Sequence, residues 1–199
     1  MILYQLNTFK ESPLEKAINK GRLPPAATIP EQAIMFARGV SMMTNAHYKR
    51  ISMSHWGRDT RERNFYNLLI KQGAPCLPLG SGAGGSLHGY GCFTMNKLTP
   101  YLAALETGNK PLAALMAYPK QKAVINTITG ELEVGYLNLA GIKQKHQFDL
   151  ARVCAPLLEQ WEKAGLIKRQ GDWINLTVPG QFWQVNLAQA LIDYCHKKQ

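Results

Sequence analysis

The sequence has few cysteines, and none of them forms a local pair. Cys76, Cys92, Cys154 and Cys195 lie at least 16 positions apart in a chain of 199 residues. Zinc and iron–sulfur sites usually draw two or three thiolates from one short segment, as in Cys-x2-Cys or Cys-x3-Cys. The sequence therefore predicts no local metal or cluster site. Scattered cysteines in an apolar chain are typical of buried, reduced thiols and favour a cytoplasmic protein.

Long apolar runs, low-complexity segments and internal repeats are also absent. No apolar run approaches the roughly 20 residues that a membrane-spanning helix needs. The apolar start Met1–Asn7 lacks a basic flank and a cleavage site, so we expect no secretory signal and no membrane partner. Disorder is excluded, because 46% of the residues are hydrophobic and 18% are charged. We expect one large globular domain or two small ones.

Acidic residues are scarce relative to basic ones. Lys and Arg number 23 against 13 Asp and Glu, which gives a net charge of +10. Such an excess favours anionic partners: nucleic acid, anionic lipid, or a ligand with carboxylates or phosphates. The basic residues are dispersed along the chain, however, and dispersed charge is more typical of a soluble surface than of a binding footprint.

Glycine, by contrast, is concentrated in one place. The run Leu79-Gly80-Ser81-Gly82-Ala83-Gly84-Gly85 ends a short apolar stretch that begins at Cys76. Glycine permits sharp turns and close approach of a ligand to the backbone, because it has no Cβ. The run is not a P-loop, since no Lys-Ser/Thr follows, and it does not open a helix as a dinucleotide fingerprint does. A tight structural turn and a ligand-binding loop are equal interpretations of this pattern alone.

The first half of the chain predicts an α/β unit. The expected elements are a short buried strand over Met1–Leu6, helices over residues 13–20 and 28–44, and a strand over 48–55. Ser12 and the capping pair Thr28 and Glu31 mark the two helix starts. The core face of the second helix is expected to comprise Ile34, Phe36, Ala37, Val40 and Met43. Ligands in such folds bind at the carboxyl ends of strands, where His55 and the glycine run fall.

The second half predicts a different, α+β arrangement. A helix is expected over about 101–106, and residues 123–139 suit strand and helix equally. Apolar residues at helical spacing over 150–161, interrupted by Pro156, predict two short helices or one kinked helix, ending at Gly165. Next come a hairpin over 166–177 that turns at residues 170–172 and a final helix over 181–194, whose apolar stripe is Trp183, Leu187, Ala190, Leu191 and Tyr194. Residues 147–199 are thus interpreted as a winged-helix-like module.

Several of these segments, in this order, resemble one known family. They are Leu3–Leu6, Ile51–Trp56, Arg63–Tyr66, Leu79–Gly85, and Leu176-Thr177 followed by Gly180–Trp183. Together they resemble the oxygen-independent coproporphyrinogen III oxidase family of radical S-adenosylmethionine (SAM) proteins, over nearly the whole chain. The glycine run and the Gly180–Trp183 ending are most similar to its haem-utilisation branch, HutW or ChuW, the anaerobic haem-degrading methyltransferases.

The resemblance implies an α/β fold: the last strands of a partial radical SAM barrel over residues 1–92, then an α+β C-terminal domain over 93–199. The family's early Cys-x3-Cys-x2-Cys motif holds the [4Fe–4S] cluster that cleaves SAM, and this sequence lacks it. The chain therefore resembles the C-terminal part of an enzyme that methylates and opens haem or a related tetrapyrrole and releases iron. Alone it is expected to be inactive and to need the missing N-terminal radical SAM domain or a partner chain.

The resemblance also implies ligand contacts. Residues expected to contact SAM are Asn64, Tyr66, Gly80, Gly82, Ala83, Gly84 and Gly85. Residues expected to contact haem or porphyrin are Gln5, Ser54, His55, Arg58 and Arg63. Tyr66 departs from the polar contact of relatives, and Ser54 replaces the acidic residue of the oxidases, which puts an oxidase-like role in doubt. No catalytic residue is assigned.

Structural interpretations compete with these roles. His55 is equally well explained as a hydrogen-bonded histidine at the barrel rim, and His88 is better explained as a solvated loop residue than as a haem ligand. A solvated loop also explains Arg58, Arg61 and Arg63 better than pairing with porphyrin propionates does. Four aromatic residues are better explained as the core of the winged module than as a tetrapyrrole-stacking surface: Trp161, Trp173, Phe182 and Trp183.

Two other functions stay open on the sequence. One is a standalone haem-binding or haem-handling protein. The other is a nucleic-acid binder that uses the winged-helix-like tail, but the candidate recognition helix over 157–163 carries two glutamates and one lysine, so no nucleic acid partner is expected. An unpaired strand edge at residues 1–6 predicts low solubility, pairing with a partner or homo-oligomers.

Overall fold

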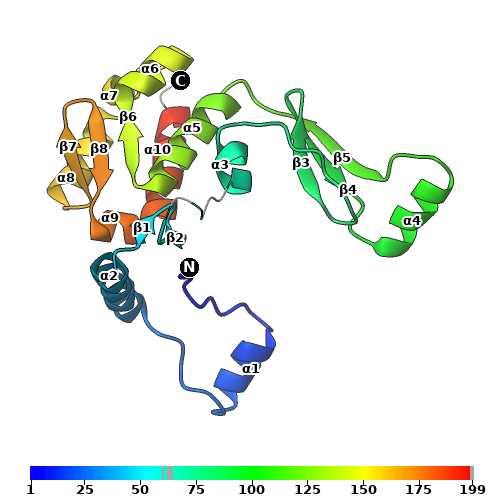
Figure 1. Ribbon diagram of the computed structural model, residues 1–199, viewed down its shortest axis with the longest axis horizontal. Helices are drawn as coiled ribbons and strands as arrows, with labels where there is room; N and C mark the ends of the chain where they lie inside the picture. Colours follow the sequence, from blue (N-terminus) through cyan, green and yellow to red (C-terminus); the bar gives the residue numbers. More distant parts are fainter. Residues whose placement is uncertain (60, 62–64, 198–199) are drawn as a thin grey trace. The chain divides into compact units, whose positions relative to one another are not determined.

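The computed structural model describes residues 1–59, 61 and 65–197 (Figure 1). The chain divides into two compact units. The first unit comprises Met1–Arg63, Glu131–Gly141 and Asp149–Gln199, and the second comprises Asn64–Gly130 and Ile142–Phe148. The domain boundary expected at residue 92 stays a prediction; in the structure this residue lies inside strand β4 (Tyr90–Thr94).

The first unit begins with two helices that local capping signals predicted correctly. Helix α1 spans Pro13–Asn19, and the Ser12 hydroxyl accepts a hydrogen bond from the Glu15 amide. Helix α2 spans Ile29–Asn45. Its capping box is present, because the backbone N–H and the hydroxyl of Thr28 both donate to the Glu31 carboxylate at 2.7 Å.

The N-terminal segment pairs with a short hairpin instead of forming a buried strand. Strands β1 (Lys49–Arg50) and β2 (Trp56–Gly57) are antiparallel, so the single strand expected over residues 48–55 is wrong. The Leu3 amide donates to the Ser54 carbonyl at 2.9 Å, and the Trp56 amide donates to the Met1 carbonyl at 2.8 Å. Residues 1–6 are exposed, which corrects the expectation of a buried strand.

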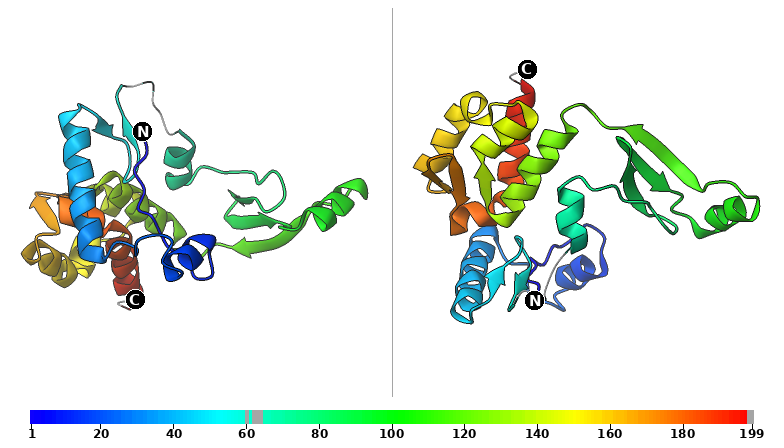
Figure 2. Two further views of the ribbon diagram at one scale, coloured as in Figure 1. Left: turned by 90° about the horizontal axis from the view of Figure 1, so that it is seen from below. Right: turned by 45° about the horizontal axis from the view of Figure 1, so that its top comes forward.

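The core of the first unit lies around a three-stranded antiparallel sheet of order β6-β8-β7 (Figures 1 and 2). The strands are β6 (Tyr136–Asn138), β7 (Ile167–Gln170) and β8 (Trp173–Leu176). The accompanying helices are α7 (Leu150–Val153), α8 (Ala155–Lys163), α9 (Val178–Phe182) and α10 (Gln184–Lys197). Fully buried side chains include Leu137, Leu150, Leu158, Ile174 and Leu191. The expected pair of short helices at Pro156 and the hairpin at residues 166–177 are confirmed.

Two predicted helix faces are wrong in part. In α2, Ile34 is 69% exposed and Ala37 is exposed, because this helix packs along its Phe36 and Met43 edge and contacts α9. Among the described side chains of α10, Gln184, Leu187, Ala188, Leu191 and Cys195 are buried. Ala190 is exposed, and so is Trp183, which precedes this helix.

The second unit contains a three-stranded antiparallel sheet of order β3-β4-β5. Its strands are β3 (Gly84–Leu87), β4 and β5 (Leu112–Ala117), and its helices are α3 (Phe65–Lys71) and α4 (Leu98–Glu106). Helices α5 (Lys122–Val134) and α6 (Leu139–His146) have residues in both units. The ambiguous stretch 123–139 is therefore mostly helix, followed by β6.

Every strand pair in the described part of the chain is antiparallel. The pairs β1–β2 and β3–β4 are each joined by a tight turn, at residues 51–55 and 88–89, a connection that only antiparallel strands allow. The structure thus has mixed helix and sheet content, and the winged-helix-like assignment stays a prediction. Among the described residues, no helix has the length and apolarity to span a membrane.

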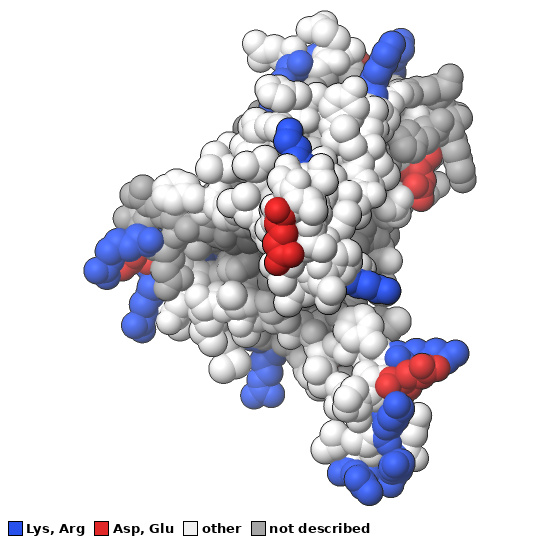
Figure 3. All heavy atoms as spheres, turned by 90° about the vertical axis from the view of Figure 1, so that its right-hand side faces the viewer, with Lys and Arg blue, Asp and Glu red and all other residues white. Residues whose placement is uncertain are grey.

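Basic side chains are dispersed over the surface, as expected. On the face shown in Figure 3, Lys and Arg side chains stand singly or in small groups between uncharged residues. On this face the described Lys and Arg side chains form no continuous basic stripe, and the expectation of no nucleic-acid partner stays a prediction.

Candidate functional site

Two adjoining clefts lie within the first unit. Their volumes are about 430 and 350 Å³, within the range of small-molecule sites. Both are lined by residues of the N-terminal segment, of α2 and of the β1–β2 hairpin, namely Leu3, Tyr4, Gln5, Phe36 and Met53. The hairpin pairing described above fixes the N-terminal segment where it forms a wall of both clefts.

The larger cleft is mainly apolar and contains few polar side chains. Gln5, which was expected to contact substrate, lines it and donates from Nε2 to Gln32 Oε1 at 3.0 Å. Gln32 in turn donates to the Ala27 carbonyl at 2.7 Å. An apolar pocket with a few oriented polar groups is the usual form of a small-molecule site.

Arg50 is the charged side chain of this cleft, and it was not among the residues expected to contact a ligand. Its guanidinium donates from Nη1 to Gln181 Oε1 and from Nη2 to the Met53 carbonyl at 3.3 Å. The guanidinium carbon lies 4.7 Å from the Trp56 ring centroid and 5.6 Å from that of Phe36. Burial lowers the pKa of Arg50 to about 10.

The expected substrate residues Ser54 and His55 follow in the hairpin. Ser54 lines the smaller cleft. The His55 ring lies 3.1 Å from Ser52 Oγ through Nδ1 and meets the Tyr4 ring edge-on at 6.4 Å. His55 belongs to neither cleft lining, so this geometry favours the hydrogen-bonded, structural interpretation. A ligand contact by His55 stays a prediction.

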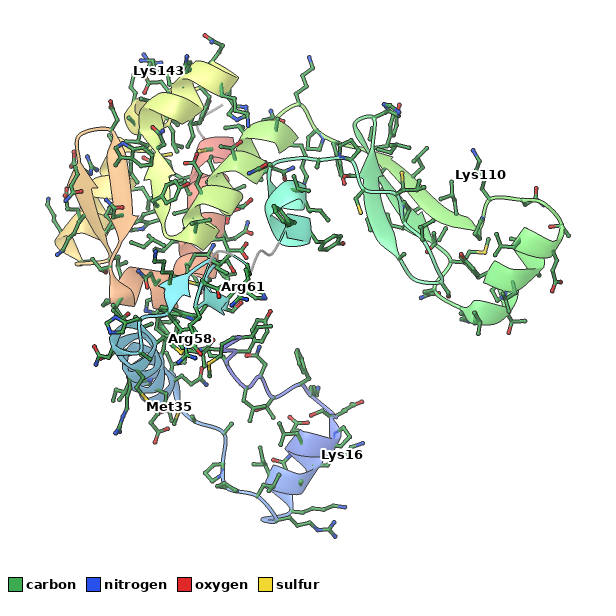
Figure 4. The ribbon with its side chains drawn as sticks, in the orientation of Figure 1. Lys16, Met35, Arg58, Arg61, Lys110 and Lys143 are labelled. Carbon is green, nitrogen blue, oxygen red and sulfur yellow. The ribbon has the colours of Figure 1, made fainter. Side chains whose placement is uncertain are left out.

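The arginines beyond β2 are differently placed (Figure 4). Arg58 lies over the Tyr48 ring at 5.4 Å. Arg61 pairs with Asp59 through two donors at 3.0 and 2.7 Å, and its side chain is 89% exposed. Arg63 and Asn64 lie outside the described residues. The solvated-loop interpretation therefore holds for Arg61, while propionate pairing by Arg58 stays a prediction.

In the second unit, the glycine run forms a compact turn clamped by Thr94. Gly80 and Gly82 have φ of +95° and +75°, values that favour glycine. The Ala83 amide donates to Thr94 Oγ1 at 2.8 Å, and that hydroxyl donates to the Gly80 carbonyl at 2.7 Å. The Gly82 amide donates to the Met95 carbonyl at 2.9 Å. These backbone groups are occupied within the turn itself.

Gly85 has a separate structural reason to be glycine. A Cβ built there would lie 2.2 Å from the Cys76 carbonyl oxygen and 2.7 Å from Pro78 Cδ. Two backbone hydrogen bonds between Cys76 and Ser86, at 2.7 and 2.8 Å, hold the segment of Cys76 this close to Gly85. At Gly84 a Cβ would meet only the Phe93 ring at 3.5 Å. Local folding thus accounts for three of the four glycines, and the expected SAM contacts of the run and of the exposed Tyr66 stay predictions.

Comparison with known proteins identifies the relatives of this chain. It is 39% identical, over 193 residues, to anaerobilin synthase from Escherichia coli O157:H7. The match covers 95% of this chain, and the chain corresponds to the C-terminal portion of that protein, 41% of its length. The expected resemblance to the coproporphyrinogen III oxidase-like radical SAM family is confirmed as a similarity.

The fold of this chain is similar to that of a solved structure. Coproporphyrinogen III oxidase from Escherichia coli, described as a radical SAM enzyme, superposes with a TM-score of 0.66 over 85% of this chain and 42% of that one. At 16% identity the likeness concerns the fold alone. No family model matches the sequence.

The four cysteines lie in separate segments of the described chain. Within the described ranges, no three His, Cys, Asp or Glu side chains gather as metal ligands would. Cys154 and Cys195 are buried with their sulfurs 3.4 Å apart, and a hydrogen bond to Cys195 raises the pKa of Cys154. All four thiols are free, and Cys76 is only half-buried, against the expectation that all are buried.

The remaining haem-related candidates are mostly surface residues. His88 has φ of +47° at the tip of the β3–β4 hairpin and lines a cleft of about 600 Å³ with Tyr118, Lys120 and Lys122. Its side chain is exposed, in agreement with the solvated-loop interpretation. Of the four aromatic residues assigned to a core, Trp161 is buried, whereas Trp173 and Trp183 are 45% and 37% exposed, so that assignment is wrong for these two.

Proposed function

We propose that this chain is the C-terminal segment of a radical SAM enzyme that acts on haem or a related tetrapyrrole. In this proposal the complete enzyme transfers a methyl group, opens the macrocycle and releases iron. The observation that carries it is the 39% identity to anaerobilin synthase across 95% of the chain. The chain spans about two-fifths of that relative, so the complete activity requires residues beyond those printed here.

The role of this segment is to bind and orient, not to initiate radical chemistry. SAM and the cluster supply the radical in this family, and the thiolates for the cluster come from an N-terminal radical SAM domain or a partner chain. The paired clefts of the first unit offer an apolar surface with Gln5 and Ser54 at its edge. An apolar macrocycle with polar substituents suits such a lining.

A second candidate is a standalone haem-binding or haem-handling protein without radical chemistry. The observation that favours it is that both clefts are formed within one unit of this chain. In both cases we place the protein in the cytoplasm, because its four cysteines are free thiols. The exposed N-terminal segment with Tyr4, Leu6 and Phe9 suits pairing with the missing domain, with a partner or with a second copy.

An anaerobic assay separates the two candidates. The chain is incubated with SAM, a low-potential reductant and haem, alone and together with the N-terminal part of the anaerobilin synthase relative. The proposal expects no 5′-deoxyadenosine from the chain alone and its appearance with loss of the haem Soret band in the mixture. Turnover by the isolated chain would contradict the proposal. Haem binding without turnover in either sample would favour the second candidate.

A further inference from the structure

We propose that Arg50 binds a carboxylate of an amphipathic ligand in the larger cleft of the first unit. The guanidinium lies at the end of β1, where the cleft wall also contains Trp56 and Phe36. The inference rests on how this cation is surrounded and on the lining of the cleft. Its extension to a tetrapyrrole propionate rests on the proposed function.

Within the described residues, the contacts of the Arg50 guanidinium are with uncharged groups. Two of its nitrogens donate to an amide oxygen of Gln181 and to the Met53 carbonyl. Its Nε is buried without a hydrogen-bond partner. In the described part of the chain, no carboxylate lies within ion-pair distance of Arg50. Arg50 is half-buried, and arginines that are partly removed from water are usually paired, because an unpaired charge loses hydration there without compensation.

The aromatic contacts compensate this cost only in part. Trp56 and Phe36 attract the guanidinium through their ring faces, an interaction much weaker than the hydration that burial removes. The lowered pKa of Arg50 records the remaining cost of desolvation. A carboxylate that enters the cleft would supply the missing counter-charge. Arginine binds carboxylates through two parallel N–H donors, which also fixes the orientation of the ligand.

The lining of the cleft defines the rest of the ligand. Apart from Arg50 and two glutamines, the walls are apolar or aromatic: Leu3, Tyr4, Leu6, Met35, Val40 and Trp56. Among the lining residues there is no Asp or Glu that would repel an anion. The ligand class is therefore a carboxylate on a bulky apolar body, and a porphyrin with its propionates is one member of that class.

The test compares ligands with and without a free carboxylate. Wild-type chain is titrated with protoporphyrin IX and its dimethyl ester, and in parallel with a long-chain fatty acid and its methyl ester. A change in tryptophan fluorescence reports binding, because the Trp56 ring lies in the cleft wall. We expect each ester to bind about 10- to 100-fold more weakly than its acid, the range for a hydrogen bond to a charged group.

Three variants locate the effect. Arg50→Met should weaken the binding of the acids by the same factor and leave the binding of the esters unchanged, so that acid and ester bind with equal affinity. Arg50→Lys keeps the charge but loses the two parallel N–H donors, so its affinity for the acids should lie between those of the wild type and Arg50→Met. Arg38→Met, at an exposed position of α2 outside the cleft lining, should behave as wild type. Melting curves show which variants are folded, and the comparison of acid with ester in the wild type needs no variant.

The outcomes separate the two proposals. Fatty acid binding that depends on Arg50, without porphyrin binding, supports the carboxylate site and contradicts the tetrapyrrole function. If protoporphyrin IX and its ester bind with equal affinity, and Arg50→Met binds both as the wild type does, the result supports tetrapyrrole binding and overturns the role of Arg50. The absence of binding by any of the four ligands overturns the role of Arg50 as well.

Discussion

Replacing Gly85 by alanine tests whether the glycine run is held by folding or by a ligand. The new Cβ would overlap the Cys76 carbonyl oxygen, at 2.2 Å, and lie within 3 Å of Pro78. Because both obstacles are main-chain or ring atoms, the segment 76–78 must move away from β3. The move breaks two backbone hydrogen bonds between Cys76 and Ser86, worth about 1 kcal/mol each, and overpacking costs about 1–3 kcal/mol. We expect a loss of about 3–5 kcal/mol.

Hydrogen exchange at single amides is the measurement that isolates this effect. The amides of Cys76 and Ser86 should lose their protection in Gly85→Ala without any ligand present. Gly84→Ala is the matched control, since its Cβ would make an ordinary 3.5 Å contact with Phe93 and should leave stability within about 0.5 kcal/mol. Unchanged protection in Gly85→Ala would refute the packing explanation. The glycine would then have to be explained by a ligand.

Two further predictions concern the first unit. Leu191→Ala removes a side chain of α10 that is 0% exposed, and it should lower the free energy of unfolding in urea by about 2–5 kcal/mol. The control Val185→Ala, at a position of the same helix that is 74% exposed, should lower it by less than about 0.5 kcal/mol. Equal losses of stability would mean that α10 packs by another face. The hydrogen bonds from Thr28 lower the pKa of Glu31 below its usual 4.5, so this carboxylate stabilises α2 fully above pH 4.5 and the contribution is lost as the pH falls through the lower, folded-state value. Glu31→Gln should remove this part of the acid dependence of helicity by circular dichroism, and an unchanged acid profile would show that the capping box does not form in solution.

Signals that act within one turn of chain were reliable guides to this fold. Ser12, the Thr28–Glu31 pair and the glycines at 165 and 171 each end or begin an element where the sequence placed it. Capping depends on a side chain and a backbone group three residues apart, so no tertiary contact is needed to predict it. The family resemblance, based on the order of short motifs, was equally reliable.

Periodicity failed where only part of a helix is packed. Ile34 fits the apolar period of α2, but the helix meets its neighbours along the side of Phe36, and no other element covers Ile34. Apolar character also misled at Met1–Leu6, where main-chain bonds to the hairpin, and not burial, hold the segment. A sequence states which faces are apolar, but it does not state how many of them find a partner.

The Arg50 cleft shows why a site of this kind escapes a linear reading. Its guanidinium is held by Phe36, Met53, Trp56 and Gln181, and the last of these is 131 positions away in the sequence. Along the chain Arg50 is one of 23 basic residues and lies just outside the Ile51–Trp56 segment that carries the family resemblance. Only burial separates it from the solvated arginines such as Arg61, which pairs with an adjacent Asp59. A desolvated cation without a carboxylate is therefore a stronger pointer to a ligand than the glycine run, whose shape folding already explains.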